Sequence, residues 1–432
     1  MYPNLYYVFK DLFGIKIEVF RFINSFGFFV AISFLVAAAL LSRELTRKSK
    51  EGVLQPTDTR ITVGKPATTK ELLLNFLLGF FLGYKILALF LLGSQVTQDP
   101  QAYIFSGQGN IWIGLLTGAL FAWMKWRERK KQELKRPEEK IIRVWPQDRV
   151  GEITIIALIV GLLGAKMFDI FENWSEFLQN PGDFLLSGGG LTFYGGLICS
   201  TIAIIIYARK NKISIRHLAD AIAPSLMIAY AIGRIGCQVS GDGDWGIYNS
   251  AYKIDSTLNI APAAPDEFKQ TVLANSVYFQ RFHDNVDSIP HAYYLKPAAL
   301  EFLPNWIFAY HYPNNVNRVG VPIPGCDEMY CNRLLIPVFP TPLYETLACT
   351  LLFFILWYFR KRIKIVGTLF ALYLILNGFE RFMIEKIRVN NKMNFLGFQP
   401  TQAEVISSGL MLVGALLWLF LWQKNRTTLK KV

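Results

Sequence analysis

Nine long apolar segments, separated by polar or charged stretches, dominate the hydropathy pattern of the chain. A helix needs about 20 consecutive apolar residues to cross a bilayer. Windows of this length predict spans at 20–42, 72–94, 110–125, 152–170, 191–208, 218–235, 338–358, 365–384 and 403–422. Two of these segments are less regular than the others, because 110–125 is short and 218–235 is interrupted by polar residues. The pattern predicts an all-α polytopic membrane protein with about nine transmembrane helices.

The composition agrees with this interpretation. Of the 432 residues, 52% are hydrophobic and 18% are charged, whereas a soluble domain carries about 25% charged residues. A soluble enzyme of this composition would expose large apolar patches and aggregate. The net charge of +13 raises the question of nucleic acid, but the basic residues fall in short loops between the apolar segments. We therefore expect no nucleic-acid partner.

The distribution of Lys and Arg predicts the orientation of the chain. The basic stretches follow every odd-numbered span, at 43–70, 125–149, 209–216, 360–364 and 424–431. The loops 95–110 and 171–190 contain neither Lys nor Arg. Because short cytoplasmic loops carry the excess of basic residues, we expect the N-terminus outside and the C-terminus in the cytoplasm of a multi-pass protein.

Two pairs of spans repeat one another at a constant offset of 81 residues. The matched positions are Glu71 and Glu152, Gly83 and Gly164, Lys85 and Lys166, Pro100 and Pro181, and Gly114 and Gly195. Chance similarity between apolar segments would match Leu and Phe, whereas here Gly, Pro, Lys and Glu coincide. The segment 72–125 is therefore predicted to be a duplicate of the helical hairpin that follows it.

The polar segment 247–336 interrupts the series of spans. It lies on the expected outer side and is rich in Pro, Asn and Tyr, which predicts a small extracytoplasmic subdomain with an accessory role. Cys326 and Cys331 are close together in an oxidising compartment, where a local disulfide is expected. The predicted organisation is 1–43 (outer segment and first helix), 72–125 (added hairpin), 152–246 (core helices), 247–336 (subdomain) and 337–432 (C-terminal core helices and basic tail).

Four polar clusters stand at the expected outer ends of the spans. They are GGGLTFYGGLI at 188–198, the Arg234 region with its Gly-Asp-Gly-Asp turn, FPTPLYETL at 339–347, and NGFERFMIEKIRVN at 377–390. An ionisable residue at the centre of a membrane helix costs about 2.5–3.5 kcal/mol on insertion scales, which makes such residues functional candidates. The alternatives are a helix-packing face for the glycines, snorkelling for Arg234, and a structural salt-bridge network for the last cluster.

The clusters suggest an anionic lipid headgroup as the ligand. Arg234 and Arg381 can hold a phosphate by forked, charge-assisted contacts, and carboxylates and glycines surround them in the sequence. The four histidines fall outside the predicted spans. We expect no metal and no cofactor.

These motifs, in this order and spacing, resemble the prolipoprotein diacylglyceryl transferases of the bacterial cytoplasmic (inner) membrane. The carriers are 194–197, 233–237 with the turn 241–246, 340–345, and Arg381-Phe382 with Glu385 and Arg388. The resemblance implies a seven-span core, so that the added hairpin brings the count to nine. It also implies transfer of the diacylglyceryl group of phosphatidylglycerol to the cysteine thiol of a lipobox, with release of glycerol phosphate.

The resemblance implies a set of site residues and leaves the proton acceptor open. Arg234 and Arg381 would hold the phosphate, and Gly195, Gly196, Gly246, Tyr344, Glu345 and Arg388 would line the phosphatidylglycerol site. The chain has Tyr194 and Phe339 where the family commonly has His, and Phe26 where many members have Tyr. No histidine base stands at these positions, so Tyr194, Glu385 or Asp242 would take the thiol proton.

Two other functions are consistent with a polytopic protein of this kind. A lipid or anion transporter would place its charges at mid-membrane and its repeats in inverted topology, whereas these hairpins are parallel copies and the charges gather at one face. An inactive lipoprotein-binding relative fits the missing histidines but not the retained arginines. The expected partners are phosphatidylglycerol, a prolipoprotein signal peptide with its lipobox cysteine, and membrane lipids, and the chain is expected to be a monomer.

Overall fold

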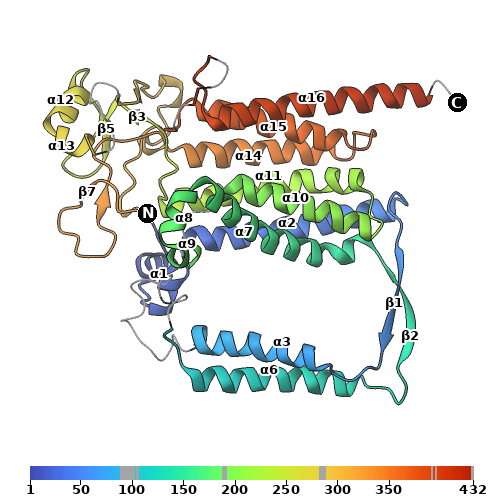
Figure 1. Cartoon of the computed structure of the whole chain (residues 1–432). Helices are drawn as coiled ribbons and strands as arrows, with labels where there is room; N and C mark the ends of the chain where they lie inside the picture. Colours follow the sequence, from blue (N-terminus) through green and yellow to red (C-terminus); the bar gives the residue numbers. More distant parts are fainter. Residues whose placement is uncertain are drawn as a thin grey trace. The chain divides into compact units, whose positions relative to one another are not determined.

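The computed structural model describes residues 1–87, 103, 107–186, 192–281, 289–390, 393–394 and 397–429. The chain is mostly helical, with small strands between and after the helices (Figure 1). The long helices are α2 (Ser25–Lys50), α3 (Thr69–Phe81), α6 (Ile111–Lys131), α7 (Val150–Glu172), α10 (Phe193–Lys210), α11 (Ile215–Ser240), α14 (Thr341–Phe359), α15 (Thr368–Glu385) and α16 (Gln402–Leu429). A π-helical turn, Leu82–Leu87, continues α3.

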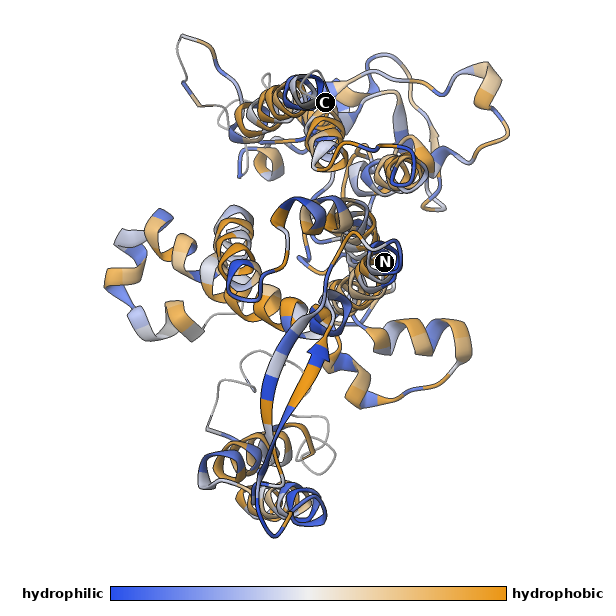
Figure 2. Ribbon diagram, turned by 90° about the vertical axis from the view of Figure 1, so that its right-hand side faces the viewer, coloured by the Kyte–Doolittle hydropathy of each residue, from blue (hydrophilic) through white to orange (hydrophobic). Residues whose placement is uncertain are grey.

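Each of the nine predicted segments coincides with one of these helices, although residues 88–94 lie outside the described part of the chain. Within the described residues, five helices are long and apolar enough to cross a membrane. They are Ser25–Lys50, Pro146–Glu172, Ile215–Ser240, Thr341–Phe359 and Gln402–Thr427. The hydropathy colouring in Figure 2 shows apolar residues along much of the long helices. The chain is thus a polytopic membrane protein, and the count of nine spans stays a prediction.

Shorter elements connect the long helices. The short α-helices are α1 (Leu5–Phe13), α8 (Trp174–Gln179), α9 (Pro181–Leu186), α12 (Glu267–Ala274) and α13 (Ser276–Phe279). The strands are β1 (Thr57–Val63), β2 (Glu138–Val144), β3 (Tyr248–Asn249), β4 (Tyr252–Ile254), β5 (Ile260–Pro262), β6 (His291–Ala292), β7 (Val321–Pro322) and β8 (Asn332–Arg333). Strands β1 and β2 form an antiparallel ribbon that joins α2 to α3 and α6 to α7 (Figure 1).

The chain divides into two compact units. One contains Met1–Val8, Asn24–Leu40 and Arg216–Val432, and is called the arginine unit below after the cluster it carries. The other contains Phe9–Ile23 and Leu41–Ile215, and is called the hairpin unit after its two helical hairpins. The predicted first helix is therefore shared, since its N-terminal part belongs to the arginine unit and its last turns to the hairpin unit.

Matched glycines lie at the helix contacts of both hairpins in the hairpin unit. A Cβ atom on Gly83, in the π-helical turn that continues α3, would stand 2.7 Å from the carbonyl oxygen of Ile113 in α6. A Cβ atom on Gly164 of α7 would stand 2.8 Å from the carbonyl oxygen of Gly195 in α10. Both helix pairs therefore approach too closely for a side chain at these positions. The shared device supports the duplication inferred from the 81-residue offset.

In the arginine unit, the helices enclose an apolar core. Met227 of α11 packs with Cys349, Phe353 and Leu356 of α14 and with Leu369 of α15. This cluster fixes the three helices that supply the charged residues described below. Helix α2 also packs here, because a Cβ atom on Gly236 would stand 3.0 Å from Cβ of Phe29.

The segment 247–336 belongs to the arginine unit and has small apolar cores of its own. One core contains Tyr252 and Phe308, and another contains Phe279 and Ile336. The predicted disulfide between Cys326 and Cys331 is present. Because this segment lies against the turn after α11, it bears on the candidate site.

Candidate active site: an arginine and carboxylate cluster

Arg234 lies in the penultimate turn of α11 and is held from three sides. Its Nε is 2.9 Å from Oε2 of Glu345, its Nη1 pairs with Asp244, and its Nη2 donates a 3.2 Å hydrogen bond to the hydroxyl of Tyr230. The guanidinium also lies over the Tyr230 ring, 5.1 Å from its centroid. With 13% of its side chain exposed, Arg234 is fixed in place rather than extended into solvent.

Glu345, in the first turns of α14, is the centre of the cluster. Its side chain is completely buried, and its Oε1 accepts a 3.1 Å hydrogen bond from Nη1 of Arg381 and a 3.0 Å hydrogen bond from Tyr230. Nη1 of Arg388 lies 3.6 Å from the same oxygen. A buried carboxylate is tolerated when it is paired and hydrogen-bonded, and Glu345 has three arginines and a tyrosine around it.

Asp244 joins two arginines from the exposed side of the cluster. Its Oδ1 accepts a 2.6 Å hydrogen bond from Nη2 of Arg388, and its Oδ2 pairs with Arg234. Burial opposes ionisation, but the two arginines outweigh it and lower the pKa of Asp244. Its side chain is 36% exposed, against none of Glu345. Asp244 is thus the ionised and more accessible carboxylate of the two.

Glycines allow the turn that carries this aspartate. Gly241 and Gly243 adopt φ angles of +63° and +98°, in the left-handed region that favours glycine. Gly246 hydrogen-bonds through its N–H to the carbonyl of Phe339, and a Cβ there would stand 2.5 Å from the carbonyl oxygen of Ile387. The close approach brings the chain next to Arg388 against the turn, so Gly246 has a positioning role.

Asp242 and Cys237 lie beside the ion pairs. Burial raises the pKa of Asp242, and the Cys237 thiol donates a 3.8 Å hydrogen bond to Oδ2 of Asp244. The Cys237 sulfur is 3.6 Å from Nη1 of Arg234. Potential ligand atoms of Cys237, Asp242 and Asp244 lie within 4.8 Å of one another. A metal ion there would compete with two arginines for Asp244, so the surroundings suit an ion-pair network better than a metal centre.

The predicted fourth cluster forms part of the same network. Nη2 of Arg381 lies 3.1 Å from Oε2 of Glu385, one helical turn further along α15. Asn390 also donates a hydrogen bond to Glu385. Glu385 is buried and ion-paired, and Arg381 connects it to Glu345.

The segment 247–336 holds the turn from the other side. The side-chain amide of Asn317 donates a 2.7 Å hydrogen bond to the carbonyl of Asp242, and the N–H of Val316 donates to Ser240. The hydroxyl of Tyr344 donates a 2.7 Å hydrogen bond to the carbonyl of Ile307. These contacts support Asp242 and Tyr344, and the accessory role of the segment stays a prediction.

Tyr194, Gly195 and Gly196 lie in the first turn of α10, in the hairpin unit. A Cβ on Gly195 would stand 2.4 Å from Cβ of Phe168, and one on Gly196 would stand 2.9 Å from the carbonyl oxygen of Gly161. The two glycines therefore pack α10 against α7, as the helix-packing alternative predicts. Tyr194 is half-buried, and the preceding glycines at 188–190 fall outside the described residues.

Three residues of the cluster were assigned no role from the sequence, although Cys237 and Thr341 lie within the motifs quoted above. Tyr230 hydrogen-bonds to Glu345, Cys237 contacts Arg234, and Thr341 donates a 2.7 Å hydrogen bond to the carbonyl of Asp244. Tyr230 precedes Arg234 by four residues, so helical spacing alone places the two on one face. Thr341 belongs to the first turn of α14, four residues before Glu345, and the same spacing would have found it.

The fold and the site define a class: a polytopic membrane protein that gathers three arginines around buried carboxylates at one end of its helices. Within that class, the family model described as prolipoprotein diacylglyceryl transferase matches residues 110–420. The chain belongs to this family. The match begins at α6 and does not include α2, although α2 packs against α11 through Gly236.

Curated relatives cover most of the chain. A phosphatidylglycerol–prolipoprotein diacylglyceryl transferase from Leptospira interrogans is 26% identical over 342 residues, which cover 68% of this chain and 86% of the relative. The enzyme of the same name from Shouchella clausii is 27% identical and covers 66% of this chain and 80% of the relative. One from Dehalococcoides mccartyi is 30% identical over 40% of this chain and 62% of the relative.

Proposed function

We propose that the chain transfers the diacylglyceryl group of phosphatidylglycerol to the lipobox cysteine of prolipoproteins and releases glycerol phosphate. The observation that carries the assignment is the convergence of Arg234, Arg381 and Arg388 on Glu345 and Asp244 in a chain of this family. We place the protein in the bacterial cytoplasmic membrane, with the N-terminus outside, the C-terminus inside and a monomer as the working unit.

The reaction exchanges one bond at a glyceryl carbon. The thiolate of the substrate cysteine attacks the carbon that bears the phosphate ester, so a carbon–sulfur bond forms as the carbon–oxygen bond breaks. The bonding electrons leave with the phosphate oxygen of glycerol phosphate, and the thiol proton passes to a base. Guanidinium groups that are already in place stabilise the charge on the departing phosphate, and we assign this role to Arg234 and Arg381 with Arg388.

The charges of the resting cluster suggest how the phosphate enters. Three arginines face three carboxylates, Asp244, Glu345 and Glu385. Glu345 is completely buried, whereas Asp244 is 36% exposed and stands on a glycine-rich turn. We propose that the lipid phosphate displaces Asp244 from Arg234 and Arg388, while Glu345 continues to hold the arginines in position.

The surroundings favour Asp242 as the proton acceptor among the three candidates. Glu385 is buried and already holds an ion pair with Arg381, so its carboxylate is engaged by that cation. Burial raises the pKa of Asp242, and a raised pKa suits a carboxylate for accepting a thiol proton. Tyr194 remains a candidate from the hairpin unit. We also propose that Tyr344 borders the phosphatidylglycerol site of the arginine unit and that the turn at Gly246 supports it, and we keep Gly195 and Gly196 as binding candidates within the hairpin unit.

The added hairpin at 72–125 is assigned no reactive role. Ile113, Gly114 and Leu115 stand where the second copy has Tyr194, Gly195 and Gly196. The scaffold glycine is thus retained at Gly114, while the aromatic hydroxyl is missing. We propose that the chain is organised accordingly, with the added hairpin at 72–125, core helices at 152–246 and 337–432, and the supporting segment at 247–336.

The deciding experiment uses the purified full chain, phosphatidylglycerol labelled in its acyl chains, and a lipobox peptide. We expect a labelled thioether with the Cys peptide and none with the matching Cys→Ser peptide. Arg234→Ala serves as the protein control, because it removes the proposed phosphate contact. Movement of labelled lipid between the leaflets of reconstituted vesicles, without any thioether, would favour a transporter and contradict the assignment.

A further inference from the structure

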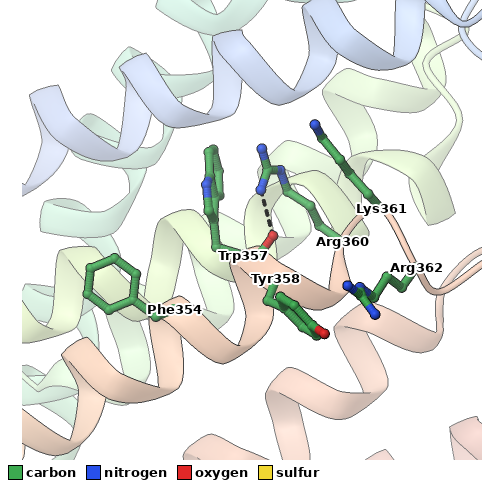
Figure 3. Close-up of a pocket in the computed structure, with 6 residues that line it drawn as sticks. All are labelled: Phe354, Trp357, Tyr358, Arg360, Lys361 and Arg362. Atoms are coloured by element: carbon green, nitrogen blue, oxygen red, sulfur yellow. Dashed lines mark hydrogen bonds between the residues drawn. The ribbon is translucent and has the colours of Figure 1, made fainter.

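A second basic site lies at the opposite end of α14 from the arginine cluster. Trp357, Tyr358, Arg360, Lys361 and Arg362 border a hollow of about 590 Å³ together with Phe354 (Figure 3). Arg360 follows Glu345 by 15 residues, a rise of about 22 Å along an α-helix. The two sites therefore lie near opposite faces of a bilayer whose hydrocarbon core is about 30 Å thick.

Aromatic rings hold the two arginines of this hollow. Cζ of Arg360 is 3.3 Å from the centroid of the Trp357 ring, and Cζ of Arg362 is 4.0 Å from that of Tyr358. Figure 3 also shows the Arg360 guanidinium hydrogen-bonded to the carbonyl of Trp357. A guanidinium stacked on a ring makes this contact with its face, and its N–H donors lie in the plane of the group, the geometry in which arginine binds planar or tetrahedral anions.

The loop that follows is fixed by a buried carboxylate of α11. Asp220 accepts hydrogen bonds from the backbone N–H groups of Gly367 and Phe370, at 2.7 and 3.0 Å. Trp357 and Ile363 pack against the apolar core of the arginine unit. The loop therefore presents its cations from a defined backbone rather than from a free chain.

The charge of this hollow is strongly unbalanced. Arg360, Lys361, Arg362 and Lys364 stand within five residues, and the sequence has no acidic residue between Glu345 and Glu380. Polybasic sites next to a bilayer attract anionic lipids, by about 1 kcal/mol per basic residue. The rings of Trp357 and Tyr358 also orient the guanidinium groups of Arg360 and Arg362, which a diffuse basic loop would not do.

We propose that this hollow binds the phosphate of an anionic phospholipid in the leaflet opposite the arginine cluster. Arg360 would bind the phosphate oxygens with Lys361 beside it, and Arg362 would add positive charge from the side of Tyr358 (Figure 3). Phe354 and Tyr358 are 59% and 54% exposed and provide an apolar wall for the glycerol and acyl chains. A free phosphate ion would use the cations but not this wall, which is why a lipid is the better occupant. The inference does not rest on the transferase assignment.

The test counts lipids on the delipidated full chain by native mass spectrometry after addition of phosphatidylglycerol. Because phosphatidylglycerol is also the proposed substrate, the measurement uses Arg234→Ala as the background in which the first site is impaired. On that background, Arg360→Gln/Arg362→Gln should lose the remaining tightly bound lipid, with at least a fivefold rise in its half-saturating concentration. Phosphatidylcholine should not replace it.

A matched control separates a site from diffuse charge. Lys424→Gln/Arg426→Gln also removes two cations beside a stacked tryptophan, since Cζ of Arg426 is 3.8 Å from the Trp422 ring, and it should leave lipid binding unchanged. An equal loss in both double variants would overturn the proposal in favour of general electrostatics. Full competition by inorganic phosphate at the lipid's own concentration would also overturn it, by assigning the hollow to a free anion.

A measurement on the unmodified protein covers the case in which the variants do not fold. A photoactivatable phosphatidylglycerol that carries its reactive group near the headgroup should label the peptide containing residues 354–362. Labelling spread over all basic loops, without enrichment at this peptide, would contradict the proposal.

Discussion

Replacement of Arg234 tests the phosphate site most directly. In Arg234→Ala, Glu345 keeps Arg381 at 3.1 Å and Arg388 at 3.6 Å, and Asp244 keeps Arg388 at 2.6 Å. Removing one partner of a buried ion pair costs about 3–5 kcal/mol when the other charge is left alone. Here both carboxylates keep a cation, so we expect a stability loss of about 2 kcal/mol, below that range.

The loss of activity should be much larger than the loss of stability. Truncation of one partner of a desolvated, hydrogen-bonded charge pair costs about 2–5 kcal/mol, and each 1.36 kcal/mol corresponds to a tenfold change in rate. We therefore expect Arg234→Ala to lower kcat/KM by roughly 30- to 5,000-fold. Arg234→Lys keeps the charge, but one ammonium cannot reach Glu345, Asp244 and Tyr230 together, so it should lose about tenfold or more.

The assay measures membrane abundance and thioether yield on the same samples. Arg143→Ala provides the control for loss of an arginine, because its side chain is 68% exposed, and it should behave like the unmodified protein. If Arg234 had only a structural role, Arg234→Ala would accumulate poorly, but the protein that remained would work at its normal rate. Normal abundance with near-normal turnover would refute the phosphate role and leave Arg381 and Arg388 as the remaining cations.

Three further predictions follow from neighbouring contacts. If Asp242 takes the thiol proton, Asp242→Asn should be severely impaired at pH 7 and recover as the pH rises through the thiol pKa of about 8.5, whereas Glu385→Gln should show no such recovery in its pH–rate profile. If Asp244 competes with the lipid phosphate, Asp244→Asn should lower KM for phosphatidylglycerol about fivefold, for a competing ion pair of about 1 kcal/mol; a higher KM would show that Asp244 positions the arginines instead. Lys85 donates 2.8 and 2.7 Å hydrogen bonds to two backbone carbonyls within the added hairpin. Lys85→Met should therefore lower the melting temperature, but it should reduce the thioether yield far less than Lys166→Met does. Equal losses of yield would mean that both hairpins serve the site.

The local part of the site could be predicted from the sequence. The i,i+4 spacing of Arg381 and Glu385 places the pair on one helical face, and their ion pair is present. The Cys326–Cys331 disulfide was also predicted. These features depend on residues that are close along the chain, where helix geometry or short loops limit the possible arrangements.

The contacts between helices could not be predicted in the same way. Arg234 meets Glu345 across 111 positions of the chain, and their pairing depends on how α11 and α14 are aligned lengthwise. That alignment follows from the packing of residues such as Met227 and Phe353. The apolar pattern of the sequence predicts that these residues are buried, but it does not predict which of them contact one another. Gly246 shows the same limit, because its constraint comes from the carbonyl oxygen of Ile387 on a distant segment.

The two carboxylates that face Arg234 stand on different kinds of backbone, and this difference supports an exchange of anions at the site. Three arginines brought together without counter-ions would repel one another and carry a large desolvation penalty. Glu345 reduces both effects from a helix whose geometry cannot change without loss of its hydrogen bonds. Asp244 stands on a glycine-containing turn outside the helices, and its side chain is 36% exposed, so its carboxylate can rotate away without loss of a helical hydrogen bond. When a phosphate takes the place of Asp244, the cluster exchanges one anion for another, so the arginines remain compensated throughout. An enzyme that kept its arginines unpaired until the lipid arrived would have to tolerate buried, uncompensated charge in the resting state.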